Sequence, residues 1–386
     1  MQTGCVDIIG GGVAGLAAAL AFRLRGCDVQ LFEQAPAITE VGAGLQISPN
    51  GFKVLDALGL GDALRARSRP AAAVDLRDYR GARVLRMDLS ASRAQPFYFV
   101  HRADLIDVLE QAARAAGVCL QLGQPITPAR ARDGSVSIPG GQGGLILGAD
   151  GVHSKLRQLL NPDQQAFFTG QVAWRAIVPN VTDHPDQAQL HMGPGRHIVS
   201  YPLRGGDMVN LVAIQEQAQW RDDGWNHAGD PDQMRQVFDD FTPLAPLLAQ
   251  VKQVHVWGLQ RRAIADTWCA PNAALLGDAA HPTLPFLAQG ANLALEDAFA
   301  LAALVDGASD LPAALARYAA LRRPRVTRAI AAANGNAWKY HLRARPLRFA
   351  AHSALRLVGA IAPAAMLRQF EWLYGYDITR DVTGLK

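Results

Sequence analysis

The chain has 386 residues, of which 49% are hydrophobic and 19% are charged, and its formal net charge is +4. This length and composition favour two globular domains and exclude a chain that is disordered over most of its length. No segment reaches the roughly 20 apolar residues that a membrane span needs, and the N-terminus lacks a secretory signal pattern. A cytoplasmic protein is expected.

The cysteines support the same compartment. They lie far apart and form no CxxC pair, which argues against a zinc site, a redox dithiol and a disulfide framework. No other pattern in the sequence resembles a metal site, so none is expected. The four cysteines are Cys5, Cys27, Cys119 and Cys269.

The first 35 residues predict a strand, a glycine turn, a helix and a second strand. CVDII is a short apolar strand, residues 13–25 form an alanine-rich helix, and DVQLFE is the second strand. Such a βαβ unit predicts a parallel sheet that is buried on both faces. Two later segments, GLILGADG and AALLGDAA, have the same character of a buried strand that runs into a tight turn.

A different pattern lies between these pieces. HIVSYPL and MVNLVAI alternate in polarity and are joined by RGGD, which predicts an antiparallel hairpin with its turn at Gly205 and Gly206. The chain is therefore expected to interleave two domains and to end in helices that break at Pro346 and Pro363. The βαβ pieces are 1–75, 98–165 and 262–335, the antiparallel domain is 76–97 and 166–261, and the helical segment is 336–386.

The first glycine turn has the spacing of a dinucleotide-binding loop. Gly10 permits the tight turn, Gly12 lets a pyrophosphate approach the backbone, and Gly15 lets helix and strand pack closely. The helix that begins with Val13 and Ala14 presents free N–H groups to the phosphates. A glycine turn that binds nothing is the alternative, but strand, helix and acid all agree with binding. The acid, Glu33, ends the second strand and is placed to accept hydrogen bonds from the ribose of FAD or NAD.

Two further motifs distinguish FAD from NAD. DGVHSKLR contains Asp150 and Arg157, and LLGDAAHPTLPFLAQGAN contains Asp278, Pro285 and Gln289. With VGAGLQISPNG, HRADL, the WRA around Trp174 and WLYGYD, the chain resembles the class A flavoprotein monooxygenases over essentially its whole length. Its closest likeness is to the branch of salicylate, 3-hydroxybenzoate and 6-hydroxynicotinate hydroxylases. The resemblance implies an α/β fold in which a Rossmann-like FAD-binding domain is interleaved with an antiparallel-sheet substrate domain.

The resemblance also implies roles for particular residues. Asp278 would bind the ribityl chain of FAD, Arg102 the ribityl or phosphate region, and Asp150 and Arg157 would serve FAD placement and NAD(P)H use. Small residues let the flavin ring swing between two positions; these are Gly42, Ala43 and Gly44. The helix that Gln289, Gly290, Ala291 and Asn292 begin would stabilise negative charge on the reduced flavin. Pro285 would lie at the reacting edge of the ring, although a proline that merely starts a helix is an alternative.

The substrate side depends on one strand. His197 and Tyr201 lie four residues apart on it and therefore face the same side of the sheet. The pair resembles the active-site pair of the hydroxybenzoate and hydroxynicotinate hydroxylases, so His197 is the candidate base for a phenol and Tyr201 the group that orients the substrate. An exposed histidine beside a core tyrosine is the alternative. Weaker candidates for the pocket wall are Gln46, Arg175 and His191.

The implied reaction is the hydroxylation of a phenolic or heteroaromatic molecule through a flavin hydroperoxide, with FAD, dioxygen and NADH or NADPH. Two alternatives stay open: a peripheral membrane flavoprotein that hydroxylates a quinone precursor, and a non-catalytic redox sensor. The segment 322–370 carries ten Lys or Arg residues and no Asp or Glu. A solvated helical face, a weak membrane-surface contact or a partner surface explains it better than nucleic-acid binding does. A monomer or a homodimer is expected.

Overall fold

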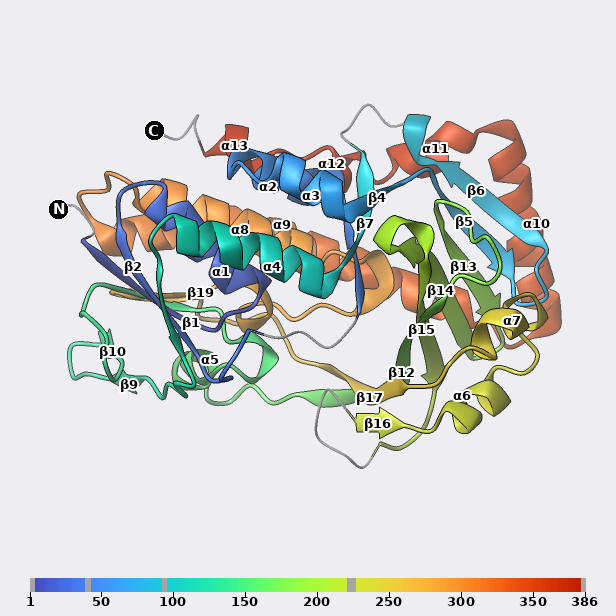
Figure 1. Ribbon diagram of the computed structural model, residues 1–386, viewed down its shortest axis with the longest axis horizontal. Helices are drawn as coiled ribbons and strands as arrows, with labels where there is room; N and C mark the ends of the chain where they lie inside the picture. The colour runs from blue at the N-terminus through green and yellow to red at the C-terminus, as the bar shows by residue number, and fades with distance from the viewer. Residues whose placement is uncertain (1–3, 39–42, 92–95, 221–226, 383–386) are drawn as a thin grey trace.

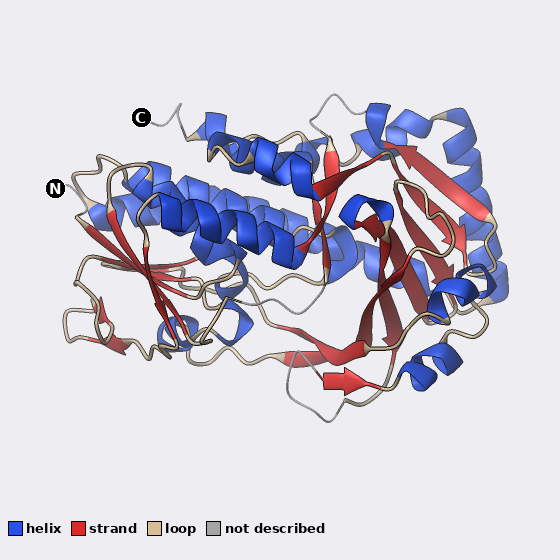
Figure 2. Ribbon diagram, in the orientation of Figure 1, coloured by secondary structure: helices blue, strands red, loops and turns tan. Residues whose placement is uncertain are grey.

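The computed structural model describes residues 4–38, 43–91, 96–220 and 227–382. Its strands form two large sheets, which lie in the two halves of the molecule in Figures 1 and 2. The chain also forms a smaller sheet of three strands, which are in spatial order β3 (Gly44–Ile47), β7 (Phe97–His101) and β4 (Ser68–Ala71).

The first large sheet is parallel apart from one edge pair. In spatial order its strands are β18 (Cys269–Ala270), β19 (Ala273–Leu275), β11 (Leu145–Gly148), β1 (Cys5–Ile9), β2 (Asp28–Glu33) and β8 (Cys119–Leu122). One face is covered by α1 (Val13–Arg23), α4 (Arg102–Ala115), α8 (Gly290–Val305) and α9 (Leu311–Ala337), and the short α5 (Lys155–Leu160) lies on the other (Figure 1). Because both faces are covered, central strands such as β1 are almost wholly apolar.

The second large sheet is mainly antiparallel. Its strands are β16 (His227–Gly229), β17 (Val254–Arg261), β12 (Phe167–Pro179), β15 (Met208–Glu216), β14 (Arg196–Leu203), β13 (Gln187–Gly193), β5 (Ala73–Asp78) and β6 (Arg83–Asp88). The predicted hairpin is β14–β15, joined at residues 204–206. The interleaved α/β fold is thereby confirmed. The exact domain boundaries stay a prediction; β5 already belongs to this sheet from Ala73.

Short helices complete the two halves. Around the first half lie α2 (Pro49–Ala57), α3 (Gly61–Arg67), α12 (Glu371–Tyr374) and α13 (Ile378–Asp381). Beside the second lie α6 (Pro231–Val237), α7 (Ala245–Leu248), α10 (Arg345–Ile361) and α11 (Pro363–Arg368). A separate two-stranded sheet pairs β9 (Ala129–Arg130) with β10 (Val136–Ser137).

The helix α10 packs along the edge strand β6 (Figure 1) and carries several exposed apolar side chains. Leu347, Phe349, Leu357 and Ile361 are all exposed, and Arg345 and Arg356 accompany them. Among the described residues, no helix combines the length and the hydropathy needed to span a bilayer. The weak membrane-surface contact stays a prediction.

A buried charge network joins α8 to α9. Asp297 accepts hydrogen bonds from Nε of Arg322 at 2.7 Å and from the backbone N–H of Gly277 at 3.0 Å, and it lies 2.5 Å from Nε2 of His281. The neighbouring Glu296 pairs with Arg322 at 2.6 Å. The side chains of Glu296, Asp297 and Arg322 are completely buried. Because a buried charge is tolerated only when it is paired, these groups depend on one another.

The arginines decide the protonation of both carboxyls. Burial alone would raise the pKa of Glu296, but Arg322 and Arg325 hold it below its usual value. Burial likewise opposes ionisation of Asp297, while His281 and Arg322 lower its pKa. A carboxyl with a lowered folded-state pKa stabilises the fold above its unfolded pKa, and this contribution is lost as the pH falls through the folded value. The network is therefore expected to weaken only in acid.

We expect Arg322→Met to lower the free energy of unfolding by about 3–5 kcal/mol, because it leaves two buried carboxylates without their common cation. Urea unfolding at neutral pH measures the change. Arg323→Gln is the matched control, since Arg323 is exposed and its pair with Asp266 should contribute about 0–1 kcal/mol. Equal stability of the two variants would contradict the role given to Arg322.

Candidate active site

The glycine loop has the geometry of a phosphate-binding turn. Gly10 has a φ of +105°, and a Cβ there would lie 2.5 Å from the carbonyl oxygen of Ala149. A Cβ at Gly15 would lie 1.9 Å from the carbonyl oxygen of Gly10, so helix and strand touch at that point. A Cβ at Gly12 would meet nothing within 4 Å. Gly10 and Gly15 therefore serve close packing of the backbone. Gly12 faces open space at the start of α1, next to Val13 and Ala14.

The acid at the end of β2 braces this loop. Glu33 accepts a hydrogen bond from the backbone N–H of Gly11 at 2.7 Å and another from Ala35 at 2.8 Å. It thus lies against the glycine turn, which is where the ribose prediction requires it. Its bond to the ribose itself stays a prediction.

The carboxyl group of the GD motif is accessible to solvent, although protein atoms pack closely around it. Asp278 is exposed, in η5 (Gly277–Ala279), yet the protein around it raises its pKa, while His281 and Arg102 act in the opposite direction. Burial likewise raises the pKa of Asp150, whose Oδ1 has no hydrogen-bond partner in the structure. Accessible or unsatisfied polar atoms of this kind suit a polyol with many hydroxyl groups.

Arg157 occupies a different environment. It is buried, and its guanidinium donates to the carbonyl oxygens of Ala263, Ala279 and Ala280 and to Gln164. These bonds hold the backbone that follows Asp278, so any influence on FAD would pass through that backbone. A direct contact between Arg157 and FAD stays a prediction.

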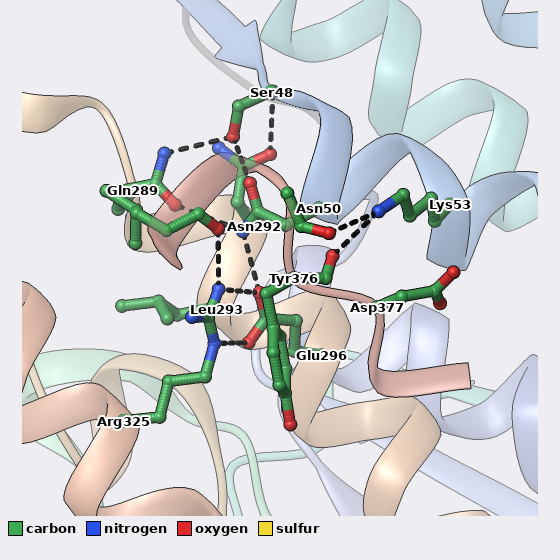
Figure 3. Close-up of polar contacts among 12 residues, drawn as sticks. Ser48, Asn50, Lys53, Gln289, Asn292, Leu293, Glu296, Arg325, Tyr376 and Asp377 are labelled. Carbon is green, nitrogen blue, oxygen red and sulfur yellow. Dashed lines mark hydrogen bonds and ion pairs between the residues drawn. The ribbon is translucent and has the colours of Figure 1, made fainter. Parts of the chain in front are cut away.

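The start of α8 is clasped to the start of α2 (Figure 3). Gln289 donates to Oγ of Ser48 at 2.9 Å, and Oδ1 of Asn292 accepts from the backbone N–H of Ser48 at 3.0 Å. Asn50 donates both to Gln289 at 3.1 Å and to Glu296 at 2.6 Å. The helix N-terminus that Gly290 and Ala291 begin is therefore held in place without a side-chain cap. Such a preorganised positive end suits a flavin ring that gains negative charge.

Hydrogen bonds from α2 and α9 also hold the C-terminal segment. Lys53 of α2 donates to the carbonyl oxygens of Gly375 and Tyr376, at 2.7 and 3.1 Å. Arg325 donates to Glu296 and to the carbonyl oxygens of Trp372 and Leu373. The WLYGYD segment is thus attached to α2 and, through Arg325 and Glu296, to α8, the helix that the QGAN motif begins (Figure 3).

A large apolar cavity of about 450 Å³ begins beside the start of α8, where Ser48 and Gln289 line it. One part of its wall comes from β3 and the loop before α8, where Pro285 lies in η6 (Pro285–Leu287). The other part comes from β5, β6, β13, β14 and α10. Its described wall contains no Asp, Glu or Arg side chain, and Lys339, its one lysine, is exposed. Representative wall residues are Gln46, Ser48, Leu76, Leu85, Met87, Leu190, Met192, His197, Pro285, Gln289, Leu355 and Phe370.

The four predicted substrate residues divide into two pairs. His197 and Gln46 line the cavity. Tyr201 does not, because it is buried between Gly44 and Phe99, with the two aromatic rings stacked at 4.9 Å. Arg175 lies over the ring of Trp257 at 5.1 Å and is also absent from the wall.

The remaining predicted positions are less informative. His191 is buried outside the cavity wall, and burial lowers its pKa to about 4. Gly42 lies outside the described residues, whereas Ala43 is buried and Gly44 hydrogen-bonds Asn210 at 2.9 Å. Among the residues that the structure describes, no group of His, Cys, Asp and Glu side chains could hold a metal ion.

His197 has partners that the sequence did not indicate. Its Nδ1 lies 2.6 Å from Nε2 of His341, in η7 (Trp338–His341), and Nδ1 of His341 lies 3.1 Å from Oε1 of Glu216. These residues are 144 and 125 positions apart, so no local spacing connects them. Burial lowers the pKa of His197 well below its ordinary value, and the neighbouring His341 acts in the same direction. Both effects favour the neutral imidazole, the form that has a lone pair to accept a proton.

Comparison with known proteins identifies the class. The family model described as FAD binding domain matches residues 3–333, and the chain belongs to this family. It is a single-component flavoprotein of the aromatic hydroxylase class, and the open face at Gly12 and the polar groups at Asp150 and Asp278 fit FAD.

Named relatives span the whole chain. A 3-amino-4-hydroxybenzoate 2-monooxygenase of Streptomyces platensis is 32% identical, and 96% of each chain is covered. The 3-hydroxybenzoate 6-hydroxylase of Polaromonas naphthalenivorans is 33% identical, with 97% of this chain and 96% of the relative covered. The solved structure of the tetrameric 2-methyl-3-hydroxypyridine-5-carboxylic acid oxygenase is 26% identical, with 98% of each chain covered and a TM-score of 0.77.

We expect Asp278→Ala to weaken FAD binding, because a lost charge-assisted hydrogen bond costs roughly 1.5–3 kcal/mol, or about 10- to 150-fold in Kd. Flavin fluorescence during titration of the apoprotein measures Kd. Asp163→Ala, which changes an exposed aspartate, should leave Kd unchanged. Equal affinity of the Asp278 variant and the wild type would remove Asp278 from the cofactor site.

Proposed function

We propose that the chain consumes NADH or NADPH and dioxygen to hydroxylate an uncharged, largely apolar phenolic or heteroaromatic molecule in the cytoplasm. The observation that carries this proposal is the cavity itself, which connects the clasped start of α8 with His197. FAD, when bound there, accepts electrons from the nicotinamide and activates dioxygen. The sequence holds a single GxGxxG fingerprint, so NAD(P)H is proposed to bind only transiently.

The wall of the cavity supports an uncharged substrate. Burying a carboxylate requires a cation or several hydrogen bonds, since its desolvation is otherwise very costly. The described wall offers only Lys339 as a fixed cation, and an exposed lysine is well screened by water. Arg175, a predicted candidate for the pocket wall, packs on Trp257 outside that wall and offers it no cation.

The size of the cavity supports an apolar substituent. The part bounded by β5, β6, β13 and α10 lies beyond the residues proposed to contact the flavin ring, and Leu76, Leu85, Met87 and Leu355 line it. An alkyl or aryl group that fills this part would gain roughly 25 cal/mol for each Å² of apolar surface removed from water. The phenolic end would then lie near His197.

We expect methyl 3-hydroxybenzoate and 4-hexylphenol to stimulate NAD(P)H oxidation with a KM at least about 10-fold below that of 3-hydroxybenzoate, because only the acid must bury a charge. The two benzoates differ only in that charge and form a matched pair. Initial rates of NAD(P)H consumption, with the product identified by mass, provide the measurement. Preference for the acid would show that the site contains a cation outside the described wall.

We expect His197→Ala to retain FAD and to slow hydroxylation by about 10²–10⁴-fold, the usual cost of a lost general base. NAD(P)H would still be consumed, with hydrogen peroxide released in place of product. The defect should shrink as the pH rises, because the phenol then ionises without assistance. Coupling of NAD(P)H consumption to product, measured against pH, tests this.

His184→Gln is the control for that variant. His184 is also buried and contacts Ser200 of the same strand at 2.9 Å, but it is not part of the cavity wall. Its replacement should leave coupling unchanged. If the His197 variant behaved in the same way, His197 would be only a part of the sheet.

A further inference from the structure

Hydrogen-bonded groups connect the cavity with the protein surface. His197 on β14 is 2% exposed and His341 is 3% exposed, whereas the Glu216 side chain at the end of β15 is 32% exposed. The contacts are 2.6 Å between the two imidazoles and 3.1 Å from His341 to Glu216. The second carboxylate oxygen of Glu216 pairs with Arg343 at 2.6 Å, and Arg343 is 70% exposed.

The chemistry of these groups fixes the direction of each hydrogen bond. The Glu216 carboxylate can only accept, so Nδ1 of His341 carries the hydrogen. A neutral imidazole has one donor nitrogen and one acceptor, so Nε2 of His341 must accept from Nδ1 of His197. Neutral His197 then keeps a lone pair on Nε2. Within the described chain that nitrogen has no hydrogen-bond partner, and its residue lines the cavity.

The surroundings of His197 disfavour its protonated form. As an imidazolium it would be a buried cation that contacts another imidazole at 2.6 Å and lies against the rings of Phe286 and Tyr340. The hydrogen-bonded chain that begins at His197 reaches a carboxylate at Glu216, beyond His341. The hydrogen-bonded path for a proton from Nε2 to this carboxylate therefore runs through Nδ1.

We propose that His341 and Glu216 form a proton relay that conducts the substrate's hydroxyl proton from His197 to the surface. This proposal rests on the proposed function. The substrate O–H proton passes to Nε2 of His197, the Nδ1 proton of His197 passes to Nε2 of His341, and the Nδ1 proton of His341 passes to Oε1 of Glu216. Each imidazole gains one proton as it loses another, so both stay neutral, and Glu216 releases its proton to water. The reverse sequence returns a proton to the product and restores the starting tautomers.

Glu216 and His341 are positioning and relay residues, and they do not touch the substrate. Burial lowers the pKa of His341, while the carboxylate of Glu216 opposes that shift and Arg343 supports it. The titratable groups that face the relay are thus Arg343 at its outer end and Tyr340 beside His197. Neither can take up the proton, since an arginine is already protonated and burial raises the pKa of Tyr340 to about 12.

The first test needs no substrate. ¹⁵N-histidine NMR of the FAD-bound enzyme reports which nitrogen carries the hydrogen, and His341→Gln assists the assignment. We expect the Nδ1–H tautomer at both His197 and His341. In Glu216→Gln the amide can also donate, so the preference at both rings should be lost. An Nε2–H tautomer at His197 in the wild type would overturn the proposal.

The second test follows the proton. A pH-indicator dye in stopped flow should show one proton released for each 4-hexylphenol bound by the oxidised wild type. Release should slow at least about 10-fold in Glu216→Gln and His341→Gln, and coupling should recover at high pH as for His197→Ala. Flavin content checks that the variants fold, and His184→Gln should match the wild type. Unchanged release in both relay variants would overturn the relay.

Failure of the relay and failure of the proposed function give different results. If His197→Ala impairs hydroxylation while the relay variants do not, His197 is the base and the relay is wrong. If 4-hexylphenol does not bind, the proposed substrate class is wrong, and the tautomer measurement still decides on the relay.

Discussion

The structure depends on two adjacent carboxylates in α8 that carry charge without access to water. Asp297 fixes the GD turn through Gly277 and His281, and Glu296 fixes the start of α2 through Asn50. Arg322 and Arg325 neutralise them from α9. A misplaced partner would leave an unpaired buried charge. The network therefore admits few relative arrangements of the GD turn, α2, α8 and α9. The cofactor motifs converge because they are attached to this network.

The described wall of the cavity also carries few charged side chains. This wall is mostly apolar and holds no Asp, Glu or Arg side chain; besides the clasp and His197, its polar members include Lys339, His352 and Gln369. Burial and the neighbouring His341 lower the pKa of His197, and in the proposed relay His341 and Glu216 connect it to water. A site that excludes water from the reacting atoms needs such a connection, because protons must still cross its boundary.

Local motifs predicted much of this arrangement. The glycine loop and the hairpin β14–β15 follow from spacings of a few residues, and the structure has them as expected. His197 lines the cavity, and its role toward a substrate stays a prediction. Tyr201 shows the limit. The strand period puts it on the same face as His197, but β3 and β7 cover it with Gly44 and Phe99. Which element lies over a strand is decided by distant segments, and strand period carries no information about them.

The same reason explains the residues that were missed. His341 and Glu216 have ordinary sequence surroundings. The β14–β15 hairpin places Glu216 near His197, and only the return of the chain after α9 brings His341 to both. Arg157 was predicted from a motif, yet the motif does not say that carbonyl oxygens of residues 263, 279 and 280 would receive its donors. A motif predicts that residues belong to one site more reliably than it predicts which atoms they touch.

The order of strands in the parallel sheet affects how the chain is made. β1 pairs with β2 and β11, and β11 with β19, so the sheet is completed by a strand that begins at Ala273. Gly12 and Asp278 are predicted to hold one cofactor, and a growing chain contains both only after most of it has left the ribosome. Until then β11 has an open edge, which is a surface prone to pairing with other chains. A cofactor held by both motifs can therefore stabilise this protein only late in its synthesis.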